Sequence, residues 1–285
     1  MKIKFLSDPH ADINTWRLDS LLKDCSGDYD VALIAGDLAG DQEDIRGFLE
    51  TYFPDKKVYF VRGNHCGVYS DTNYHKRVPI SKIFKDMRKE FSKKHKNWHL
   101  LDDDYVNLGD GLYVIGATLY TDYCVYGKAL KEIHMSIGER YLNDFRLGYV
   151  EADKGSGFSV RHLRASDLLK MHKKSKRKIK QLHDKIVAED PNAKIILLTH
   201  HCLSEKCISH VFKTSKGNAS YVSNLEDWVV EKLPNVCMIH SGHVHHCDLF
   251  EFGPEDHRVQ YVINSIGYLQ YGEGSEYKKD LIMEL

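Results

Sequence analysis

Short runs of apolar residues recur along the chain, and each one ends in polar or glycine-containing residues. Five of these runs are rich in Val, Ile, Leu and Phe and have the length of buried strands. They cover residues 2–8, 30–37, 57–64, 194–201 and 236–243. Amphipathic stretches typical of helices lie near residues 12–24, 41–52, 79–95 and 221–233. This alternation predicts an α/β protein with a buried sheet.

Two further segments predict antiparallel strands. Residues 104–120 contain Gly-Asp-Gly between two strand-like runs, which is a hairpin signal. The segments "CDLFEFG" and "RVQYVINSIGY" near the C-terminus form a similar pair. We therefore expect two sheets of mixed strand direction, packed together with helices outside, in a single domain over residues 1–285. Residues 120–192 carry helical patterns instead and are expected to form a helical insert over one end of the sheets.

The overall composition narrows the possible partners. The chain has 285 residues, of which 42% are hydrophobic and 28% charged, and its formal net charge is −1. This balance gives no general field that would attract nucleic acid or an anionic membrane. No segment of the sequence has the length of a membrane-spanning helix or of a signal peptide's apolar core, and the seven Cys contain no CxxC pair. These features predict a cytoplasmic protein with reduced thiols and no membrane partner.

The residues that follow the strand-like runs are of types that bind metals. The first run ends in Asp8-Pro9-His10 and the second in Gly36-Asp37. The third ends in Gly63-Asn64-His65, the fourth in His200-His201, and the fifth in Gly242-His243-Val244-His245. In open α/β sheets, ligands bind outside the carboxyl ends of the strands, so these side chains are expected to meet at one rim. Imidazole and carboxylate groups gathered there predict a metal site.

The order DxH, GD, GNH, a late His and GHxH resembles the motif order of the calcineurin-like metallophosphoesterase superfamily over nearly the whole chain. The resemblance implies a four-layer αββα sandwich of two mixed β-sheets and two divalent metal ions, with Mn²⁺ expected and Fe or Zn²⁺ as alternatives. By motif position, Asp8, His10 and His245 would bind the first ion. The second ion would be bound by Asn64, His200 and His243, and Asp37 would bridge the two.

The same resemblance gives the expected chemistry. Two cations about 3.5–4 Å apart can clamp a phosphoryl group and stabilise the attacking and departing oxygens. We therefore expect a phosphoesterase that works by in-line attack of a metal-bound hydroxide. Protonated His65 would donate to the leaving group, and Asn64 and His65 would contact the substrate.

Several positions leave alternatives open. His201 is the alternative to His200 as a ligand, whereas His240 and His246 match no motif position, and His240 is interpreted as a structural residue. Many members of the superfamily read GDxxD, where the second Asp orients the catalytic His, but this chain has Gly40 there. Either the neighbouring Asp41 takes this role or no residue does. Cys66 follows the GNH motif where many members carry an acidic residue.

A second layer of resemblance concerns the middle of the chain. The segments "GATLYTDY", "LNDFR", "MHKKS" and "INSIGY" look like those of a branch of small bacterial and viral metallophosphoesterases with a helical insert. Substrate contacts are expected from the insert and its surroundings. The candidates are Asp122, Asn143, Asp144 and Arg146, for which helix capping and mutual pairing are the alternative roles.

Three functions are compatible with the sequence. The first is hydrolysis of phosphodiester or phosphomonoester bonds in nucleotides or other small molecules. The second is a nuclease that holds DNA or RNA with the basic run Lys173–Lys180 and with aromatic residues such as Tyr120, Tyr123 and Tyr126. A solvated helix face is the favoured interpretation of that run, because Ile179 and neighbouring apolar residues give it a buried side. The third is a binding protein with little turnover.

Overall fold

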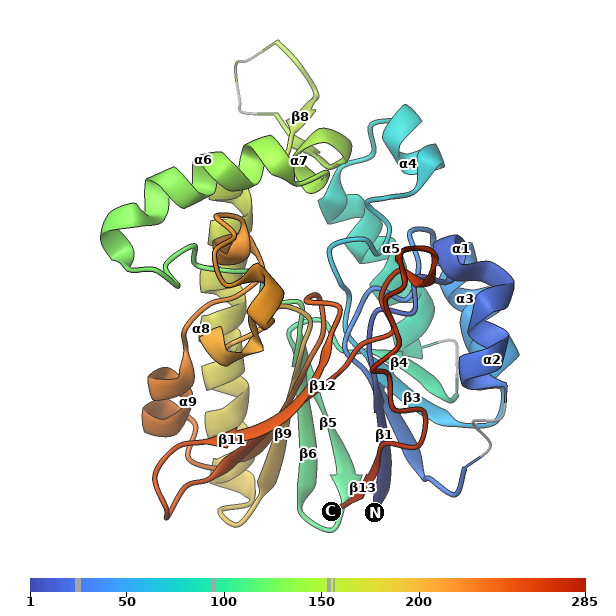
Figure 1. The fold of residues 1–285 in the computed structure, drawn as a ribbon, viewed down its shortest axis with the longest axis vertical. Coiled ribbons are helices and arrows are strands. Elements are labelled where there is room, and N and C mark those ends of the chain that lie inside the picture. The colour runs from blue at the N-terminus through green and yellow to red at the C-terminus, as the bar shows by residue number, and fades with distance from the viewer. Residues whose placement is uncertain (24–26, 94–95, 153–154, 156) are drawn as a thin grey trace.

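The structure has two large sheets, and the first contains the three predicted strands nearest the N-terminus (Figure 1). The computed structural model describes residues 1–23, 27–93, 96–152, 155 and 157–285. Five strands lie in the order β13-β1-β2-β3-β4, and β13 runs antiparallel to the others. Their bounds are β1 Lys2–Leu6, β2 Val31–Ile34, β3 Lys57–Phe60, β4 Trp98–Leu100 and β13 Ile282–Glu284. The short strands β4 and β13 were not predicted.

The second sheet has six strands in the order β11-β12-β10-β9-β6-β5. The three central strands and β12 are parallel, whereas β5 and β11 are antiparallel to their neighbours, as the two predicted hairpin-like pairs require. The bounds are β5 Asp104–Gly109, β6 Leu112–Ala117, β9 Lys194–Thr199, β10 Val236–Ser241, β11 Cys247–Phe252 and β12 Val259–Asn264.

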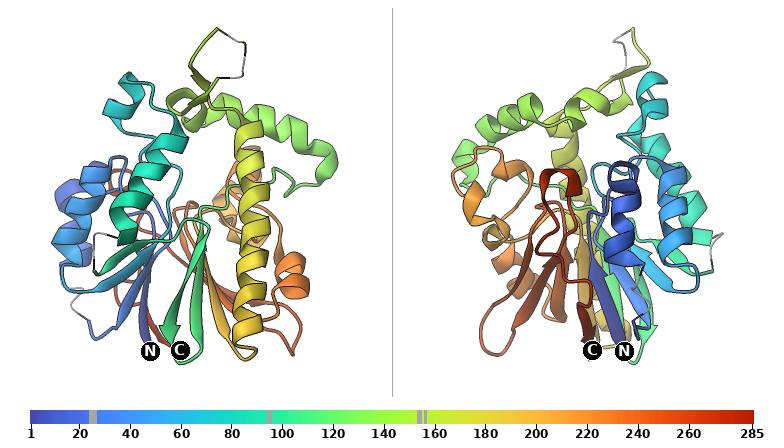
Figure 2. Two further views of the ribbon diagram at one scale, coloured as in Figure 1. Left: turned by 180° about the vertical axis from the view of Figure 1, so that it is seen from behind. Right: turned by 45° about the vertical axis from the view of Figure 1, so that its right-hand side comes forward.

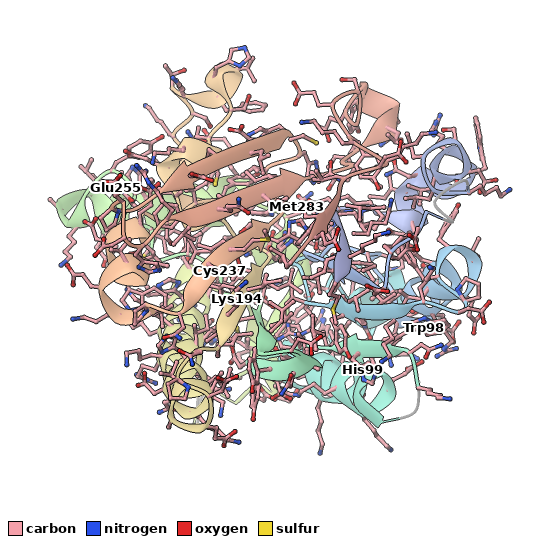
Figure 3. All side chains as sticks on the ribbon, turned by 90° about the horizontal axis from the view of Figure 1, so that it is seen from below. Trp98, His99, Lys194, Cys237, Glu255 and Met283 are labelled. Atoms are coloured by element: carbon pink, nitrogen blue, oxygen red, sulfur yellow. The ribbon has the colours of Figure 1, made fainter. Side chains whose placement is uncertain are left out.

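Three apolar cores separate four layers. Alternate residues of the two sheets, among them Phe5, Leu33, Val114 and Leu198, are buried between the sheets. The other faces of the sheets pack against helices, with one further core on each side. Figure 3 shows the two sheets from below, with Trp98 in the first sheet and Lys194 and Cys237 in the second. The expected arrangement of two mixed sheets flanked by helices is therefore confirmed.

Helices from different parts of the chain cover the outer faces of the two sheets (Figure 2). The N-terminal half supplies α1 Ala11–Asn14, η1 Thr15–Leu18, α2 Asp19–Leu22, α3 Gln42–Tyr52, α4 Asp71–His75 and α5 Ile80–Lys93. The second sheet is flanked by α8 Ala165–Glu189 and α9 Glu226–Lys232. The two chain ends lie side by side, and Met1 N donates a hydrogen bond to Leu285 O at 2.6 Å. No helix in the described ranges combines the length and the hydropathy that crossing a membrane requires.

The segment 120–192 is divided between two places. Its long helix α8 runs along the second sheet, as Figures 1 and 2 show, and contacts β6 and β5. Its other elements lie across the carboxyl ends of the strands: η2 Lys128–Leu130, α6 Lys131–Tyr141, α7 Asp144–Leu147, and the hairpin of β7 Tyr149–Glu151 with β8 Val160–His162. The hairpin was not expected. Short 3-10 turns complete the same end: η3 Glu205–Cys207, η4 His210–Phe212, η5 Asn218–Ser220 and η6 Leu269–Tyr271.

Candidate metal centre

The carboxyl ends of strands from both sheets meet at one rim. Backbone hydrogen bonds join the turns that follow the strands, such as His10 N to Asp37 O at 3.0 Å and Gly242 N to His200 O at 3.0 Å. Several residues of these turns adopt left-handed backbone angles, which are uncommon for residues other than Gly. Their φ values are 55° at Asp8, 40° at His10, 50° at Asp37, 70° at His243 and 48° at His245. The fold thus turns the chain sharply where the predicted ligands lie.

One group of possible ligands comprises Asp8, His10 and His245. Their ligand atoms lie within 4.8 Å of one another. The Nε2 atoms of His10 and His245 are 3.1 Å apart, and His245 Nε2 lies 3.7 Å from Asp8 Oδ1. The other nitrogen of the buried His10 ring, Nδ1, has no hydrogen-bond partner among the described residues. Two nitrogens directed at one point beside a carboxylate form a donor set that suits a divalent cation.

A second group comprises Asp37, His200 and His243, with Asn64 beside it. His200 Nε2 lies 3.3 Å from Asp37 Oδ2 and 3.0 Å from Asn64 Oδ1. His243 Nε2 is buried and has no hydrogen-bond partner in the described part of the chain. Asp37 Oδ2 also lies 3.9 Å from His10 Nε2, so this carboxylate stands between the two groups. The residues present therefore fit two cations with a shared carboxylate.

The protonation states of these side chains agree with metal binding. Burial holds the pKa of both His10 and His243 well below the usual range, so their rings are neutral, as a ligand must be. Burial opposes ionisation of Asp37, but the neighbouring His200 and His65 outweigh it and hold the pKa of the Asp37 carboxyl well below its usual value. Burial also disfavours the charged form of His200, whose pKa the Asp37 carboxylate nevertheless raises to about 9. A bound cation would take the place of that proton.

Residues outside the motifs orient the candidate ligands. Glu273 Oε2 lies 2.7 Å from His245 Nδ1 and accepts a hydrogen bond from Tyr268 N at 2.6 Å. Ser265 Oγ donates to Asp8 Oδ2 at 2.8 Å. Such partners fix the ring or carboxylate in the geometry that a metal requires. Sequence reasoning missed Glu273 and Ser265, although Ser265 lies in the quoted "INSIGY" segment.

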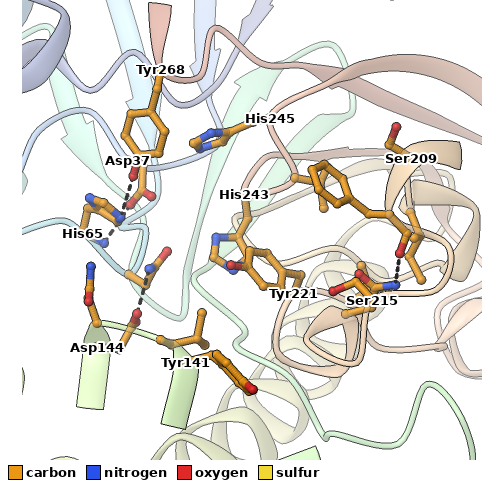
Figure 4. A pocket seen from close by; sticks show the side chains of 18 of the residues that line it. Asp37, His65, Tyr141, Asp144, Ser209, Ser215, Tyr221, His243, His245 and Tyr268 are labelled. Atoms are coloured by element: carbon orange, nitrogen blue, oxygen red, sulfur yellow. Dashed lines mark hydrogen bonds between the residues drawn. The ribbon is translucent and has the colours of Figure 1, made fainter. Parts of the chain in front are cut away.

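A cleft of about 380 Å³ opens beside these groups (Figure 4). Asp37, His65, His243 and His245 lie around its inner end. Aromatic side chains contribute much of the remaining lining: Tyr69, Tyr141, Phe212, Tyr221 and Tyr268. Figure 4 shows Tyr221 beside His243, and the two rings are stacked with centroids 4.5 Å apart.

A comparison with known families decides what this arrangement is. The family model described as calcineurin-like phosphoesterase matches residues 1–247. The chain belongs to that family. It is accordingly a metal-dependent phosphoester hydrolase, and the rim described above is its candidate dinuclear centre.

Two solved structures are similar to this phosphoesterase. Phosphopantetheinyl hydrolase from Mycobacterium tuberculosis is 16% identical, with 94% of this chain and 90% of that chain covered and a TM-score of 0.59. A dimetal phosphatase from Danio rerio is 12% identical, with 94% and 88% covered and a TM-score of 0.49. At such identities the likeness concerns the fold alone. No curated protein matches the chain.

His65 of the phosphoesterase is held by two tyrosines. Its ring stacks on Tyr69 with centroids 3.6 Å apart, and its Nε2 lies 3.1 Å from Tyr268 Oη. Its backbone N–H donates to Asp37 Oδ1 at 2.9 Å. Tyr69 Oη in turn donates to Asp144 Oδ2 at 2.9 Å, and Asn64 Nδ2 donates to the same oxygen at 3.3 Å. His65 is thus fixed beside the shared carboxylate.

The two departures of the phosphoesterase from the family's motifs have a structural account. Asp41 caps α3 through Glu43 N at 3.0 Å and accepts from Ser70 Oγ at 2.6 Å, so it serves the helix. A side chain at Gly40 would meet Asp12, whose Oδ2 lies 2.8 Å from the position of a Cβ there. Cys66 is buried, and burial raises the pKa of its thiol to about 12, so it adds no charge beside His65.

The histidines whose roles the sequence left open occupy distinct positions in the phosphoesterase. His200 faces Asp37, whereas His201 Nδ1 lies 3.3 Å from Thr118 O and its ring packs against Tyr120 and His243. His240 lies between the sheets, with its nitrogens 3.1 Å from Val262 O and 2.9 Å from Leu6 O. His246 is half-buried and belongs to neither ligand group.

The expected substrate contacts separate into two pairs. Asn143 and Asp144 line the cleft of the phosphoesterase. Asp122 does not, because its carboxylate accepts from Cys124 N at 2.9 Å and faces a different cavity. Arg146 lies on an exposed turn of α7 and donates to Asn143 Oδ1. The structure therefore does not bring Asp122 or Arg146 to the cleft.

Proposed function

We propose that this phosphoesterase hydrolyses small organic phosphodiesters, with nucleotides as the substrate class. Asp8, His10 and His245 would hold one divalent cation. The other would be held by Asn64, His200 and His243, with Asp37 shared between the two. When bound, such a pair of cations lowers the pKa of a water molecule and neutralises charge on the phosphoryl oxygens. Mn²⁺ is the proposed metal, because mixed nitrogen and oxygen ligation suits it.

The lining of the cleft carries this proposal. Its volume of about 380 Å³ suits a small molecule. Its aromatic side chains offer faces for a nucleobase, and Asn218 and Ser209 offer polar groups beside them. A polymeric substrate would need a longer surface, so a nucleotide fits this cleft better than a folded nucleic acid.

The charges of the cleft favour a diester over a monoester. A phosphomonoester carries up to two negative charges near neutral pH, whereas a diester carries one. Among the described residues, no Lys or Arg lines the cleft, but the acidic residues Asp144 and Glu273 do. The bound cations and protonated His65 would then offset the charge of a substrate, and a diester monoanion carries less charge to offset.

His65 is proposed as the acid that gives a proton to the departing oxygen. It lies beside the shared carboxylate of Asp37, and Tyr69 and Tyr268 fix its ring. A positioned general acid contributes about 10²- to 10⁴-fold to a rate. Its contribution is largest when the leaving group is a poor one, because such a group needs the proton most.

The test compares two diesters and one monoester. The purified protein is assayed with bis-p-nitrophenyl phosphate, with a dinucleoside monophosphate and with p-nitrophenyl phosphate, in Mn²⁺ and in chelator. We expect metal-dependent turnover that prefers both diesters and collapses in Asp37→Asn. His65→Ala should lose more turnover of the dinucleoside monophosphate than of bis-p-nitrophenyl phosphate, because p-nitrophenolate leaves without help.

Two control variants match these changes. Asp41→Asn changes a carboxylate that caps a helix, and His99→Ala changes a histidine of the edge strand β4 that does not line the cleft (Figure 3). Both should keep turnover within about twofold. Equal turnover of monoester and diester would contradict the proposed preference, and equal losses for both diesters in His65→Ala would contradict the proposed acid.

A further inference from the structure

A second cavity lies beside α8. It has a volume of about 830 Å³, and residues of η2, α6, α8 and α9 line it. Figure 2 shows the long helix α8, which supplies most of this lining, from two sides. No described residue lines both this cavity and the catalytic cleft. The cavity is therefore a separate feature of the molecule.

Positive side chains dominate the lining of this second cavity. Six cationic residues contribute: Lys128, Lys131, Lys173, Lys176, Arg177 and Lys180. The acidic residue in the lining is Asp122, whose Oδ1 already accepts from Cys124 N at 2.9 Å. The whole chain has a formal net charge of −1, so this concentration of positive charge is local.

Most of these cations lack a carboxylate partner. Lys180 pairs with Asp184 at 2.5 Å, one turn along α8. In the part of the chain that the structure describes, the other five form no ion pair with a carboxylate. Gathering like charges in a concave surface costs free energy unless a counter-ion enters. An anion with several charges would meet that need.

Lys176 is the most constrained cation of the group. It is half-buried, and its Nζ lies 4.8 Å from the centre of the Trp228 ring. Burial lowers the pKa of Lys176, and the nearby Asp122 acts in the opposite direction. Trp228 also offers an aromatic face at the edge of the cavity, next to the ammonium groups.

The spacing of the cations along α8 suits a chain of anionic groups. Lys173, Lys176 and Lys180 share one face of the helix, because they lie at positions i, i+3 and i+7. They extend over about 10 Å at 1.5 Å per residue. The neighbouring face of α8 is buried through Ile179 and Ile186, which makes this row of cations part of a fixed wall. Lys128 and Lys131 supply the other side of the cavity.

We propose that this second cavity binds a chain of phosphates, either a free oligophosphate or the backbone of a short single strand of nucleic acid. Lysine and arginine are the side chains that bind phosphates through charge, and a row of them follows a phosphate backbone. The inference goes beyond the proposed hydrolysis and does not depend on it, because it concerns binding at a site that shares no lining residue with the cleft. It also revises the solvated helix face that the sequence favoured.

The test uses two probes and two matched triple variants. The probes are a fluorescent twelve-nucleotide single strand, followed by anisotropy, and inorganic tripolyphosphate, followed by calorimetry, both with the metal-loaded protein. One variant combines Lys128→Gln, Lys173→Gln and Lys176→Gln. Its control combines Lys170→Gln, Lys174→Gln and Lys178→Gln, which remove equal charge from positions of α8 outside the cavity. Any binding of the probes at the metal centre should be the same in the parent protein and in both variants.

We expect the cavity variant to bind the probe about tenfold or more weakly than the control variant at low salt. For the single strand, the slope of log affinity against log salt should fall by about 2, since three contacts contribute about 0.7 each. Loss for both probes identifies a backbone-type site, and loss for tripolyphosphate alone identifies a free oligophosphate. Equal affinities in the two variants would overturn the proposal. Turnover of bis-p-nitrophenyl phosphate should stay within about twofold in both, which shows that the fold is intact.

Discussion

Glu273 shows how much of a metal site can lie outside its motifs. It belongs to a polar turn near the C-terminus, and the fold brings its carboxylate within 2.7 Å of His245 Nδ1. Burial lowers the pKa of His245, but the hydrogen bond that its ring donates to Glu273 and the charges of nearby carboxylates, Asp8 among them, together outweigh burial and raise that pKa. The carboxylate therefore increases the electron density of the ring that we propose as a ligand.

Replacing Glu273→Gln should weaken metal binding by about 10- to 100-fold, because the ring of His245 loses its charged partner. The measurement is a calorimetric titration of the metal-free protein with Mn²⁺. Glu276→Gln is the matched control, since Glu276 accepts from Cys247 N at 3.3 Å and belongs to neither ligand group. Unchanged affinity in Glu273→Gln would remove His245 from the proposed ligands.

A buried ion pair beside the rim links the stability of the protein to pH. Arg62 and Asp102 are paired, with side-chain exposures of 5% and 7%, and Arg88 Nη1 donates to Asp102 Oδ2 at 2.6 Å. Burial raises the pKa of Asp102, but the two arginines outweigh burial and hold that pKa below its usual value. The ionised carboxylate thus stabilises the fold above the unfolded-state pKa of about 3.9. This contribution is lost as the pH falls through the lower folded-state pKa.

Asp102→Asn should therefore lower the free energy of unfolding near neutral pH by about 3–5 kcal/mol, because the buried Arg62 loses its counter-charge. The same variant should lose less stability than the parent protein when the pH falls below about 4. Urea unfolding at neutral and acidic pH measures both effects. Asp86→Asn, at an exposed position of α5, should change neither by more than about 0.5 kcal/mol. Parallel pH profiles for Asp102→Asn and the parent would contradict the assignment.

The sequence could predict a residue of the rim only where a motif marks it. Asp8, Asp37 and His243 follow apolar strands directly, so both their chemistry and their place could be inferred. Glu273 could not, because nothing local distinguishes it from the residues of an ordinary surface turn, and Tyr268 belongs to the "INSIGY" segment but received no predicted role. Asp122 and Arg146 show that residue type alone does not give position, since Asp122 faces a different cavity and Arg146 donates to Asn143 Oδ1 on an exposed turn.

At the scale of elements, the turns after the strands depend on glycines that permit close approach. The position of a Cβ on Gly63 lies 1.8 Å from Asp37 Oδ1 and 2.6 Å from Asp37 N. The loop after β3 can therefore pass the shared carboxylate only without a side chain there. Gly47 in α3 offers a contrast, because nothing lies within 4 Å of its Cβ position.

Gly63→Ala should displace Asp37 and reduce kcat/KM for a diester by about 10²-fold or more, since a shift of about 1 Å has that effect on a positioned group. Gly47→Ala should leave kcat/KM unchanged and stabilise the protein by about 0.5–1 kcal/mol, because Ala is the better helix former. Steady-state kinetics measure kcat/KM of both variants, and thermal unfolding measures their stability. Full activity in Gly63→Ala would show that the loop has room to move.

Long elements could be predicted from the sequence, and short ones could not. The strands β1, β2, β3, β9 and β10 were all predicted from apolar runs, and the hairpin of β5 and β6 from its Gly-Asp-Gly turn. Strands β4, β7, β8 and β13 have three residues each, which is too short for a periodic pattern. They form by pairing with a neighbouring strand: β4 with β3, β13 with β1, and β7 with β8.

For the whole molecule, the rim joins the two sheets. Asp8, His10 and Asp37 follow strands of the first sheet, whereas His200, His243 and His245 follow strands of the second. Cations bound there would connect the halves of the sandwich and neutralise the buried carboxylates Asp8 and Asp37. Metal binding should therefore contribute to the stability of the entire fold.

Chelation should lower the midpoint of thermal unfolding by about 5 °C or more. A ligand present at 100 times its Kd stabilises the folded state by about 2.7 kcal/mol, and two ions contribute together. Differential scanning fluorimetry with chelator and with added Mn²⁺ measures the shift. Asp37→Asn should show a much smaller response to Mn²⁺ than the parent protein. An equal shift in that variant would place the stabilising metal elsewhere in the chain.

The left-handed backbone at the rim bears on how these positions can change over evolutionary time. Asp37 and His243 adopt φ values of 50° and 70°, which suit Gly and Asn best among the residues. Selection for a folded chain alone would therefore favour Gly or Asn there, whereas selection for hydrolysis retains Asp and His. A lineage released from the second demand would drift first at the rim, while the apolar cores of the sandwich stayed the same.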